Sequence, residues 1–231
     1  MKVSVVGLGW YGTPLAIELI KAGHQVMGTT RDPGKKAILE ASGIEVQLLT
    51  APSIPSPEML ATDILILNIP PFKGQLEWLK RWAFESETWV ILISSTSGNC
   101  ADCEDWIKQQ FKSWTILRFA GLLGSHRHPG NHLSGKKDLS GRLWPVNLLH
   151  QQDAVGFTEA IINKGIKHES INVLSDEHHG REEFYTEFAQ RVGIALPSFD
   201  QGDKSIRPAL DNKRARDIYD FKWPILFGTS V

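Results

Sequence analysis

The glycine-rich segment Gly7-Leu8-Gly9-Trp10-Tyr11-Gly12 constrains the fold of this chain more than any other feature. It follows the apolar run 3–6 and leads into the helix-like segment 14–20. In a G-x-G-x-x-G turn between a strand and a helix, the first glycine allows the tight turn. The second lets the backbone approach a pyrophosphate, and the third lets the helix pack on the strand. We therefore predict a dinucleotide-binding turn in which Gly7, Gly9, Trp10, Tyr11 and Gly12 contact the cofactor.

Apolar runs alternate with helix-like segments over most of the chain, which favours an α/β fold with a parallel sheet. The expected strands after the first are 25–30, 45–49, 63–69, 89–93, 114–119 and 170–174. Pro52, Pro55 and Pro57 predict irregular chain before residue 63. We expect a Rossmann-type, doubly wound parallel sheet in residues 1–174, followed by a small C-terminal substrate region in residues 175–231.

The composition narrows the class of protein. A chain of 231 residues can bury a full core without disulfides. Its net charge is −1 and its charged residues are interspersed, so we expect neither nucleic acid nor a membrane surface as a direct partner. The sequence begins with a strand-like run and contains no apolar run long enough to span a membrane, so we expect a cytoplasmic protein.

Cys100 and Cys103 have the C-x-x-C spacing of a redox pair or of half a zinc site. No second C-x-x-C or H-x-x-x-H completes a zinc site, and the Rossmann-like opening is not the setting of a thioredoxin motif. The sequence favours two ordinary thiols in a reducing compartment, and we expect no metal.

Arg31 follows the second expected strand, at the position that selects the cofactor. An acidic residue there binds the adenosine ribose hydroxyls of NAD, whereas an arginine pairs with the 2′-phosphate of NADP. Arg31 precedes Asp32, so the sequence favours NADP, with NAD as the alternative. A solvated Arg-Asp turn is the other interpretation.

Two further strand ends face the same edge of the expected sheet. Asn68, Ile69 and Pro70 end one buried strand, and Ser94, Ser95 and Thr96 end the next. Loops at the carboxyl ends of a doubly wound sheet lie beside the cofactor. We therefore expect Asn68, Ile69, Pro70 and Ser94 to contact the cofactor.

Residues 125–142 form a polar, glycine-rich segment that includes His126, His128, His132, Lys136 and Lys137. Such a segment could close as a lid over an anionic substrate or the cofactor phosphates. It could equally be a solvated loop.

Several motifs follow one another along the chain. These motifs are the glycine turn, Thr29-Thr30-Arg31, Ser94-Ser95-Thr96-Ser97, 118–124, 146–153 and the closing Asn212-Lys213-Arg214 and Trp223-Pro224. Their order resembles that of the extended short-chain dehydrogenase/reductases. This is the NAD-dependent epimerase/dehydratase family. The resemblance implies a Rossmann domain that holds NAD(P), a catalytic hydroxyl at the end of the fifth strand and a Tyr-x-x-x-Lys pair on the next helix. Thr96 best matches the hydroxyl, with Ser95 beside it. Members often pair through a helix bundle, and the sequence leaves the oligomeric state open.

The sequence departs from this family at the catalytic pair. Its tyrosines are Tyr11, Tyr185 and Tyr219, and none has lysine four positions later. The helix that should hold the pair is reduced to a short one with Asp102, Glu104, Asp105 and Lys108. One hypothesis is an atypical NADP-dependent oxidoreductase or sugar-nucleotide-type epimerase acting on a small molecule. The other is a non-catalytic regulatory protein that senses NADP(H).

Overall fold

The computed structural model describes residues 1–98 and 100–223 and divides the chain into two compact units. The first unit consists of Met1–Arg118 and Phe157–Ile171, and the second of Phe119–Gly156 and the chain from Asn172 onward. The chain therefore enters each unit twice. The polar segment 125–142 belongs to the second unit.

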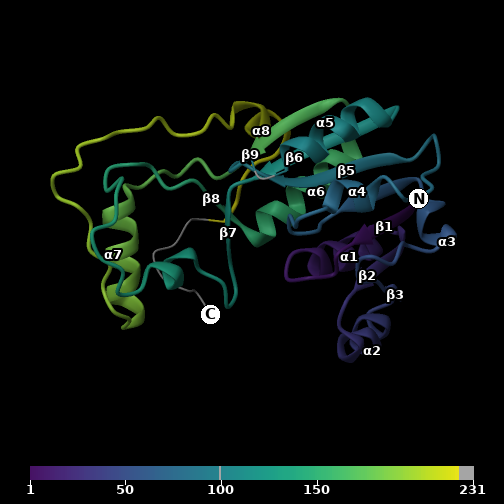
Figure 1. Ribbon diagram of the computed structural model, residues 1–231, viewed down its shortest axis with the longest axis horizontal. Helices are drawn as coiled ribbons and strands as arrows, with labels where there is room; N and C mark the ends of the chain where they lie inside the picture. The colour runs from purple at the N-terminus through teal and green to yellow at the C-terminus, as the bar shows by residue number, and fades with distance from the viewer. Residues whose placement is uncertain (99, 224–231) are drawn as a thin grey trace. The chain divides into compact units, whose positions relative to one another are not determined.

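A seven-stranded sheet forms the centre of the first unit (Figure 1). Its strands are β1 (Lys2–Val6), β2 (Gln25–Thr30), β3 (Glu45–Leu48), β4 (Ile64–Leu67), β5 (Trp89–Ser95), β6 (Ser113–Phe119) and β9 (Glu169–Val173). Their order is β3-β2-β1-β4-β5-β6-β9. The pairings of β1 with β2 and β4, of β2 with β3 and of β4 with β5 are all parallel.

The prediction of a Rossmann-type α/β fold is confirmed. The strand order reverses between β1 and β4, which lie side by side although 57 residues separate Val6 from Ile64 in the chain, and this reversal is the topological switch point of doubly wound sheets. All four residues of β4 are buried, as expected of a strand covered on both faces. The glycine turn follows β1 and Asn68 follows β4, so the fold brings both to the switch point.

The helices associated with this sheet are α1 (Gly12–Lys21), α2 (Pro33–Ala41), α3 (Pro57–Leu60), α4 (Gln75–Leu79), α5 (Ala101–Gln110) and α6 (Gln151–Lys164). The expectation of irregular chain around Pro57 was wrong, because Pro57 begins α3. Proline is well tolerated at the first helical position, and Ser56 caps this helix by accepting from the Met59 N–H. A buried cluster that includes Leu65, Leu92 and Trp78 forms part of the core.

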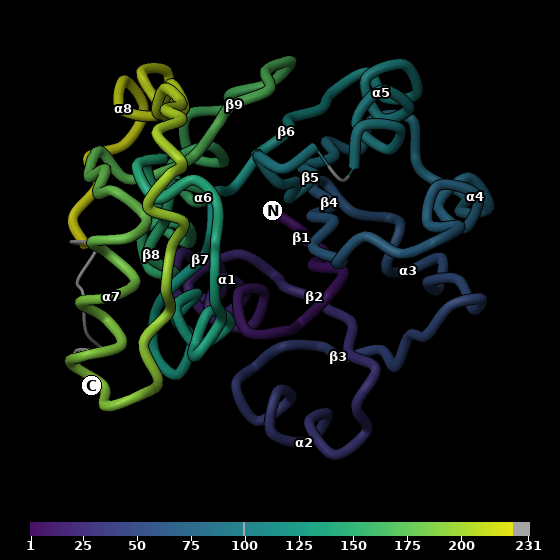
Figure 2. Tube along the Cα trace, turned by 60° about the vertical axis from the view of Figure 1, so that its left-hand side comes forward, coloured from purple at the N-terminus to yellow at the C-terminus, as the bar shows by residue number. Residues whose placement is uncertain are grey.

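The second unit contains β7 (Gly121–Leu123), the short 3-10 helix η1 (Pro129–Leu133), β8 (Leu148–His150), α7 (Arg181–Val192) and α8 (Lys213–Ile218), whose chain path is traced in Figure 2. β7 and β8 form a separate parallel pair. Buried Asp153 accepts hydrogen bonds from the Tyr219 hydroxyl and from the N–H groups of Lys222 and Trp223. This carboxylate therefore holds the closing segment in place. Pro224 lies outside the described residues.

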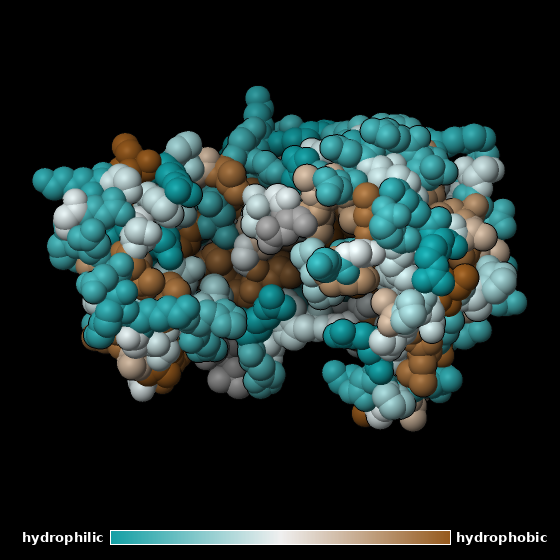
Figure 3. All heavy atoms as spheres, viewed as in Figure 1, coloured by the Kyte–Doolittle hydropathy of each residue, from teal (hydrophilic) through white to brown (hydrophobic). Residues whose placement is uncertain are grey.

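Figure 3 shows a face on which hydrophilic side chains predominate. The exposed large apolar residues, such as Ile38 and Ile206, come from separate parts of the chain. In the described part of the chain, no helix combines the length and the apolar character needed to cross a bilayer.

Candidate functional site

Gly7 and Gly12 are required by the packing of the turn itself. Gly7 has a φ of 111°, and a Cβ there would lie 2.1 Å from the Asn68 carbonyl oxygen. A Cβ on Gly12 would lie 2.1 Å from the Gly7 carbonyl oxygen. A side chain at either position would push β1, β4 and α1 apart.

Gly9 differs from these two glycines. A Cβ there would meet nothing within 4 Å among the described residues, and Gly9 is exposed. Its lack of a side chain therefore serves no internal packing. Helix α1 begins at Gly12, directly after this segment. It has no acidic residue in its first turn, and no described side chain caps its N-terminus. Open space at a helix N-terminus that no side chain caps is suited to a bound phosphate.

Asn68 shapes this turn from the neighbouring strand. Its Nδ2 donates to the Gly7 carbonyl oxygen at 2.9 Å, and its backbone N–H donates to Val6. Of its predicted companions, Ile69 packs against the core cluster and Pro70 is exposed. The Asn68 amide thus sets the shape of the turn, and contact of these three residues with a cofactor remains a prediction.

Tyr11 points into the protein and not toward the open side of the turn. Its hydroxyl lies 2.7 Å from the Thr158 hydroxyl on α6, and the ring is buried. Burial raises its pKa far above the ordinary value, against a smaller lowering by the hydrogen bond to Thr158. The Tyr11 hydroxyl is therefore not a proton donor or acceptor near physiological pH. Trp10, beside it, is half-buried.

Arg31 and Asp32 have different structural roles at the end of β2. An Asp32 carboxylate oxygen accepts from the Gly34 N–H at 2.9 Å and so caps α2. Arg31 is exposed, and its guanidinium pairs with no other described residue. The acidic side chain is engaged by the fold, and the cation is available to an anionic ligand.

The four hydroxyls at and after the end of β5 also differ. The Ser94 hydroxyl is buried and donates to Glu104 Oε1 at 2.5 Å. The Ser95 and Ser97 hydroxyls lie 2.8 Å apart. Thr96 is half-buried, and its hydroxyl forms no hydrogen bond to any described residue. Thr96 is therefore the hydroxyl of this group that could serve a ligand without breaking an internal bond.

The ion pair between Glu104 on α5 and Arg118 on β6 was not predicted from the sequence. Arg118 Nε lies 3.1 and 3.0 Å from the two Glu104 carboxylate oxygens, and Nη2 lies 2.5 Å from Oε2. Burial on its own raises the pKa of Glu104, but hydrogen bonds from Arg118 and Ser94 outweigh it and keep the pKa below its ordinary value. An arginine within a buried strand sequence was the available signal, because such a charge requires a partner.

The other tyrosines belong to the second unit and are engaged there. Tyr219 donates to Asp153, and Tyr185 packs against the ring of Phe184. Burial raises the pKa of Tyr185, against a smaller lowering by Arg181. In the polar segment, His128 is buried and stacks on Phe184 and Phe188, so part of this segment is packed. Closure of the segment as a lid remains a prediction.

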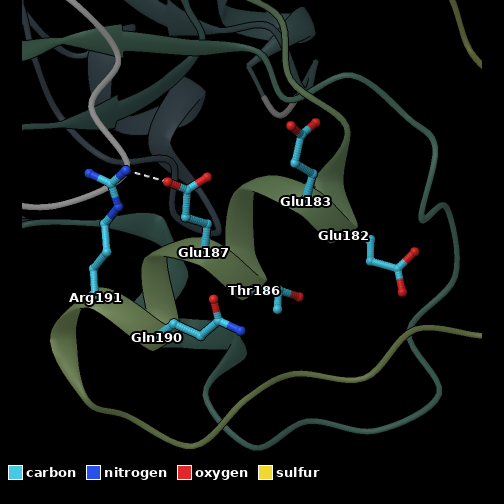
Figure 4. A pocket seen from close by; sticks show the side chains of 6 residues that line it. All are labelled: Glu182, Glu183, Thr186, Glu187, Gln190 and Arg191. Atoms are coloured by element: carbon cyan, nitrogen blue, oxygen red, sulfur yellow. Dashed lines mark hydrogen bonds and ion pairs between the residues drawn. The ribbon is translucent and has the colours of Figure 1, made fainter.

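Two other candidate features have little chemistry to offer. Cys100 and Cys103 are buried free thiols, and burial raises the pKa of both, that of Cys103 to about 11. The described residues contain no cluster of three metal-ligating side chains. A groove in the second unit is lined by α7 alone (Figure 4), where Arg191 pairs with Glu187 beside Glu182 and Glu183. A groove lined by one mostly acidic helix face is not an enclosed binding site.

Comparison with known proteins gives a family match for the N-terminal part of the chain. Residues 2–97 match the family model for the NAD binding domain of 6-phosphogluconate dehydrogenase. The chain contains an NAD(P)-binding domain of the Rossmann type. A short stretch, 30% of this chain, is also 37% identical to the 2-hydroxy-3-oxopropionate reductase of Escherichia coli strain K12, of which it covers 22%.

Other relatives align over nearly the full length. The chain is 27% identical to protein YeeZ of Escherichia coli strain K12, with 94% of this chain and 90% of that protein aligned. Among solved structures, UDP-glucuronic acid 4-epimerase from Bacillus cereus in complex with NAD has a TM-score of 0.69 at 17% identity, covering 98% of this chain and 95% of that one. A conserved protein of unknown function from Silicibacter pomeroyi has a TM-score of 0.72 at 18% identity, covering 94% and 91%. These structures share the fold.

The geometry of the NAD(P)-binding domain fits a nicotinamide dinucleotide. The open side of Gly9 and the N-terminus of α1 suit a pyrophosphate, and the end of β2 is where an adenosine ribose lies in this fold. Thr96 directly follows β5 at the same edge of the sheet. Residues that follow β1, β2 and β5 therefore lie at the carboxyl edge of the sheet.

Proposed function

We propose that this protein is an atypical NADP-dependent oxidoreductase or sugar-nucleotide-type epimerase of the extended short-chain dehydrogenase/reductase kind. The proposal depends on the Thr96 hydroxyl at the end of β5, which forms no hydrogen bond to any described residue. It lies on the sheet edge that also holds the glycine turn, where a Cβ on Gly9 would have no described atom within 4 Å. The fold shared with UDP-glucuronic acid 4-epimerase supports it by analogy.

When bound, the nicotinamide supplies or accepts a hydride. Thr96 would donate its hydroxyl hydrogen to the substrate oxygen and so orient the carbon that reacts. Ser95, held by Ser97, would support this position. Tyr11 and Tyr219 are engaged in hydrogen bonds, and no tyrosine is followed four positions later by a lysine, so the proton would pass through water.

The choice of NADP over NAD rests on the unpaired Arg31 beside the engaged Asp32. Calorimetric titration with NADPH, NADP⁺, NADH and NAD⁺ tests it. Arg31→Ala should weaken NADP(H) binding about 10- to 100-fold, because a charge-assisted hydrogen bond is worth roughly 1.5–3 kcal/mol, and should leave NAD(H) binding unchanged. Lys36→Ala is the matched control, since Lys36 on the same loop-helix segment pairs with Glu40. Equal losses for both cofactors would remove the 2′-phosphate role.

Hydride transfer itself can be tested with deuterium-labelled NADPH and a panel of UDP-sugars and small carbonyl compounds. Label in a product would establish the chemistry. Thr96→Val should then lower the rate about 100-fold or more, as expected for loss of a group that assists proton transfer. Ser42→Ala, which removes an exposed hydroxyl that bonds to the Ile38 carbonyl oxygen, should have little effect. A rate unaffected by Thr96→Val would contradict the role of Thr96.

A non-catalytic NADP(H)-sensing protein is the second candidate. The engagement of all three tyrosines in hydrogen bonds or packing favours it, since no acid–base pair of the family type remains. Tight NADP(H) binding without label transfer to any compound of the panel would support the sensor. In either case we propose that the ligand is a small molecule. We also propose that the protein works in a reducing compartment such as the cytoplasm, because its two buried thiols are free.

A further inference from the structure

The Glu104–Arg118 pair occupies the carboxyl edge of the sheet, where β5 and β6 end. Arg118 is the penultimate residue of β6, and Ser94, which bonds to the same carboxylate, is the penultimate residue of β5. The Glu104 side chain is 4% exposed and that of Arg118 is 36% exposed. The carboxylate is thus enclosed while its partner reaches solvent.

The hydrogen bonds leave one side of the guanidinium unused. Nε and Nη2 contact both oxygens of Glu104, whereas Nη1 forms no hydrogen bond to any described residue. The two-oxygen contact fixes the plane of the guanidinium, because a fork of two donors meets a fork of two acceptors. Nη1 is therefore held in one direction before any ligand arrives.

Stability alone explains this arrangement poorly. A buried ion pair loses much of its attraction to desolvation, and a pair of apolar side chains would fill the same space at least as well. Lys108 lies 3.9 Å from the same carboxylate and 3.4 Å from Asp105, so Lys108 and Asp105 balance each other and Arg118 is the main partner of Glu104. The guanidinium is the partly exposed member of this pair, at the edge where ligands of this fold bind.

We propose that Arg118 binds an oxyanion of the substrate through Nη1, and that Glu104 and Ser94 are positioning residues that hold the guanidinium for this contact. The ligand group is a carboxylate or a phosphate, since both match guanidinium geometry. This inference rests on the proposed function, because it places the substrate beside the cofactor. It adds that the substrate is anionic.

The test needs variants that remove the cation without leaving a buried charge unpaired. Arg118→Met alone strands Glu104, so the informative variant is the double replacement Glu104→Met with Arg118→Met, which replaces the pair by apolar side chains of similar size. Arg118→Lys keeps the positive charge but loses the paired N–H donors of the guanidinium. Lys112→Met is the matched control, because Lys112 forms the exposed ion pair with Glu87 at the opposite ends of the same two strands.

The experiment is a calorimetric titration of the NADP⁺-loaded protein with sodium oxalate and, separately, with inorganic phosphate. We expect saturable binding of at least one anion, weakened tenfold or more in the double methionine variant, less in Arg118→Lys and unchanged in Lys112→Met. Binding should also shift the NMR signal of the Arg118 Nε–H group, assigned from its loss in Arg118→Lys. Oxalate alone binding would indicate a carboxylate substrate, and phosphate alone a phosphorylated one.

Two results would overturn the inference: neither anion binds the wild-type protein, or the double methionine variant binds as tightly as the wild type. The same titrations on protein without NADP⁺ separate this inference from the proposed function. If NADP⁺ does not bind but the anion still requires Arg118, the cofactor proposal fails and the anion site stands. If NADP⁺ binds and the anion does not, only the anion site is rejected.

Discussion

The two ends of the sheet in the first unit use their polar side chains differently. At the amino ends, these side chains complete backbone hydrogen bonding. Asp63 accepts from the Lys2 N–H at 2.7 Å, and the Thr62 and Thr88 hydroxyls donate to the carbonyl oxygens of Lys2 and Thr62. The one exposed ion pair described between the ends of β5 and β6 there joins Glu87 and Lys112, 78% and 69% exposed.

At the carboxyl ends, several polar groups have no internal partner. Among the described residues, Arg31 and the Thr96 hydroxyl form no hydrogen bond, Arg118 keeps Nη1 unused, and Gly9 has open space above it. Both ends belong to the same strands. The difference lies in which groups the fold satisfies, and unsatisfied groups at the carboxyl edge of a doubly wound sheet are those available to a ligand.

Gly9→Asp should produce the largest effect on this contrast. The side chain has room, so the free energy of unfolding should change little, but its charge and bulk would occupy the pyrophosphate position and weaken dinucleotide binding by about 100-fold or more. Calorimetry and thermal unfolding measure the two effects. Ala22→Asp places the same charge at the opposite end of α1 and should leave binding intact. Unchanged binding in Gly9→Asp would remove the turn from the cofactor site.

The two ion pairs between β5 and β6 should differ in their contribution to stability. Arg118→Met leaves the buried Glu104 carboxylate without its main partner and should lower the free energy of unfolding by about 3 kcal/mol. Lys112→Met should change it by less than about 1 kcal/mol, because the amino-end pair is exposed. Urea unfolding gives both values. Equal losses would show that the two pairs are equivalent.

Asn68→Ala should affect both stability and binding. Loss of its bond to the Gly7 carbonyl oxygen should cost about 1 kcal/mol and, because the turn loses its fixed shape, weaken dinucleotide binding several-fold. Thr88→Val removes a comparable bond at the amino end and should cost a similar amount of stability with no effect on binding. A binding defect in Thr88→Val would argue that binding follows overall stability.

The smallest expected difference is in the acid dependence of stability. Burial alone raises the pKa of Glu104, but the bonds from Arg118 and Ser94 bring it below the ordinary value, and the bond from Lys112 lowers the pKa of Glu87. Each group therefore stabilises the fold above its ordinary pKa, and this contribution is lost as the pH falls through the lowered value. Glu104→Gln should reduce the loss of stability in acid at low and high salt. Glu87→Gln should do so only at low salt, because salt screens exposed pairs.

Local sequence pattern was sufficient to predict the fold and the turn. The glycine spacing and the apolar run of β4 require no knowledge of distant residues, since the backbone conformation and burial of a strand depend on the segment itself. The short helix expected to hold Asp102, Glu104, Asp105 and Lys108 is present as α5 (Ala101–Gln110). The prediction of irregular chain at Pro57 was wrong because the effect of a proline depends on whether it stands inside a helix or begins one.

The sequence by itself determined the parallel α/β fold, the glycine turn and a cation at the end of β2. Only the tertiary structure decided which polar groups are engaged. It paired Tyr11 with Thr158, 147 positions away, and Ser94 and Arg118 with Glu104. It also left Thr96 and Arg31 without partners among the described residues. Strand order and helix packing decide whether a hydroxyl or a charge finds a partner, and residue type and spacing along the chain do not specify that pairing.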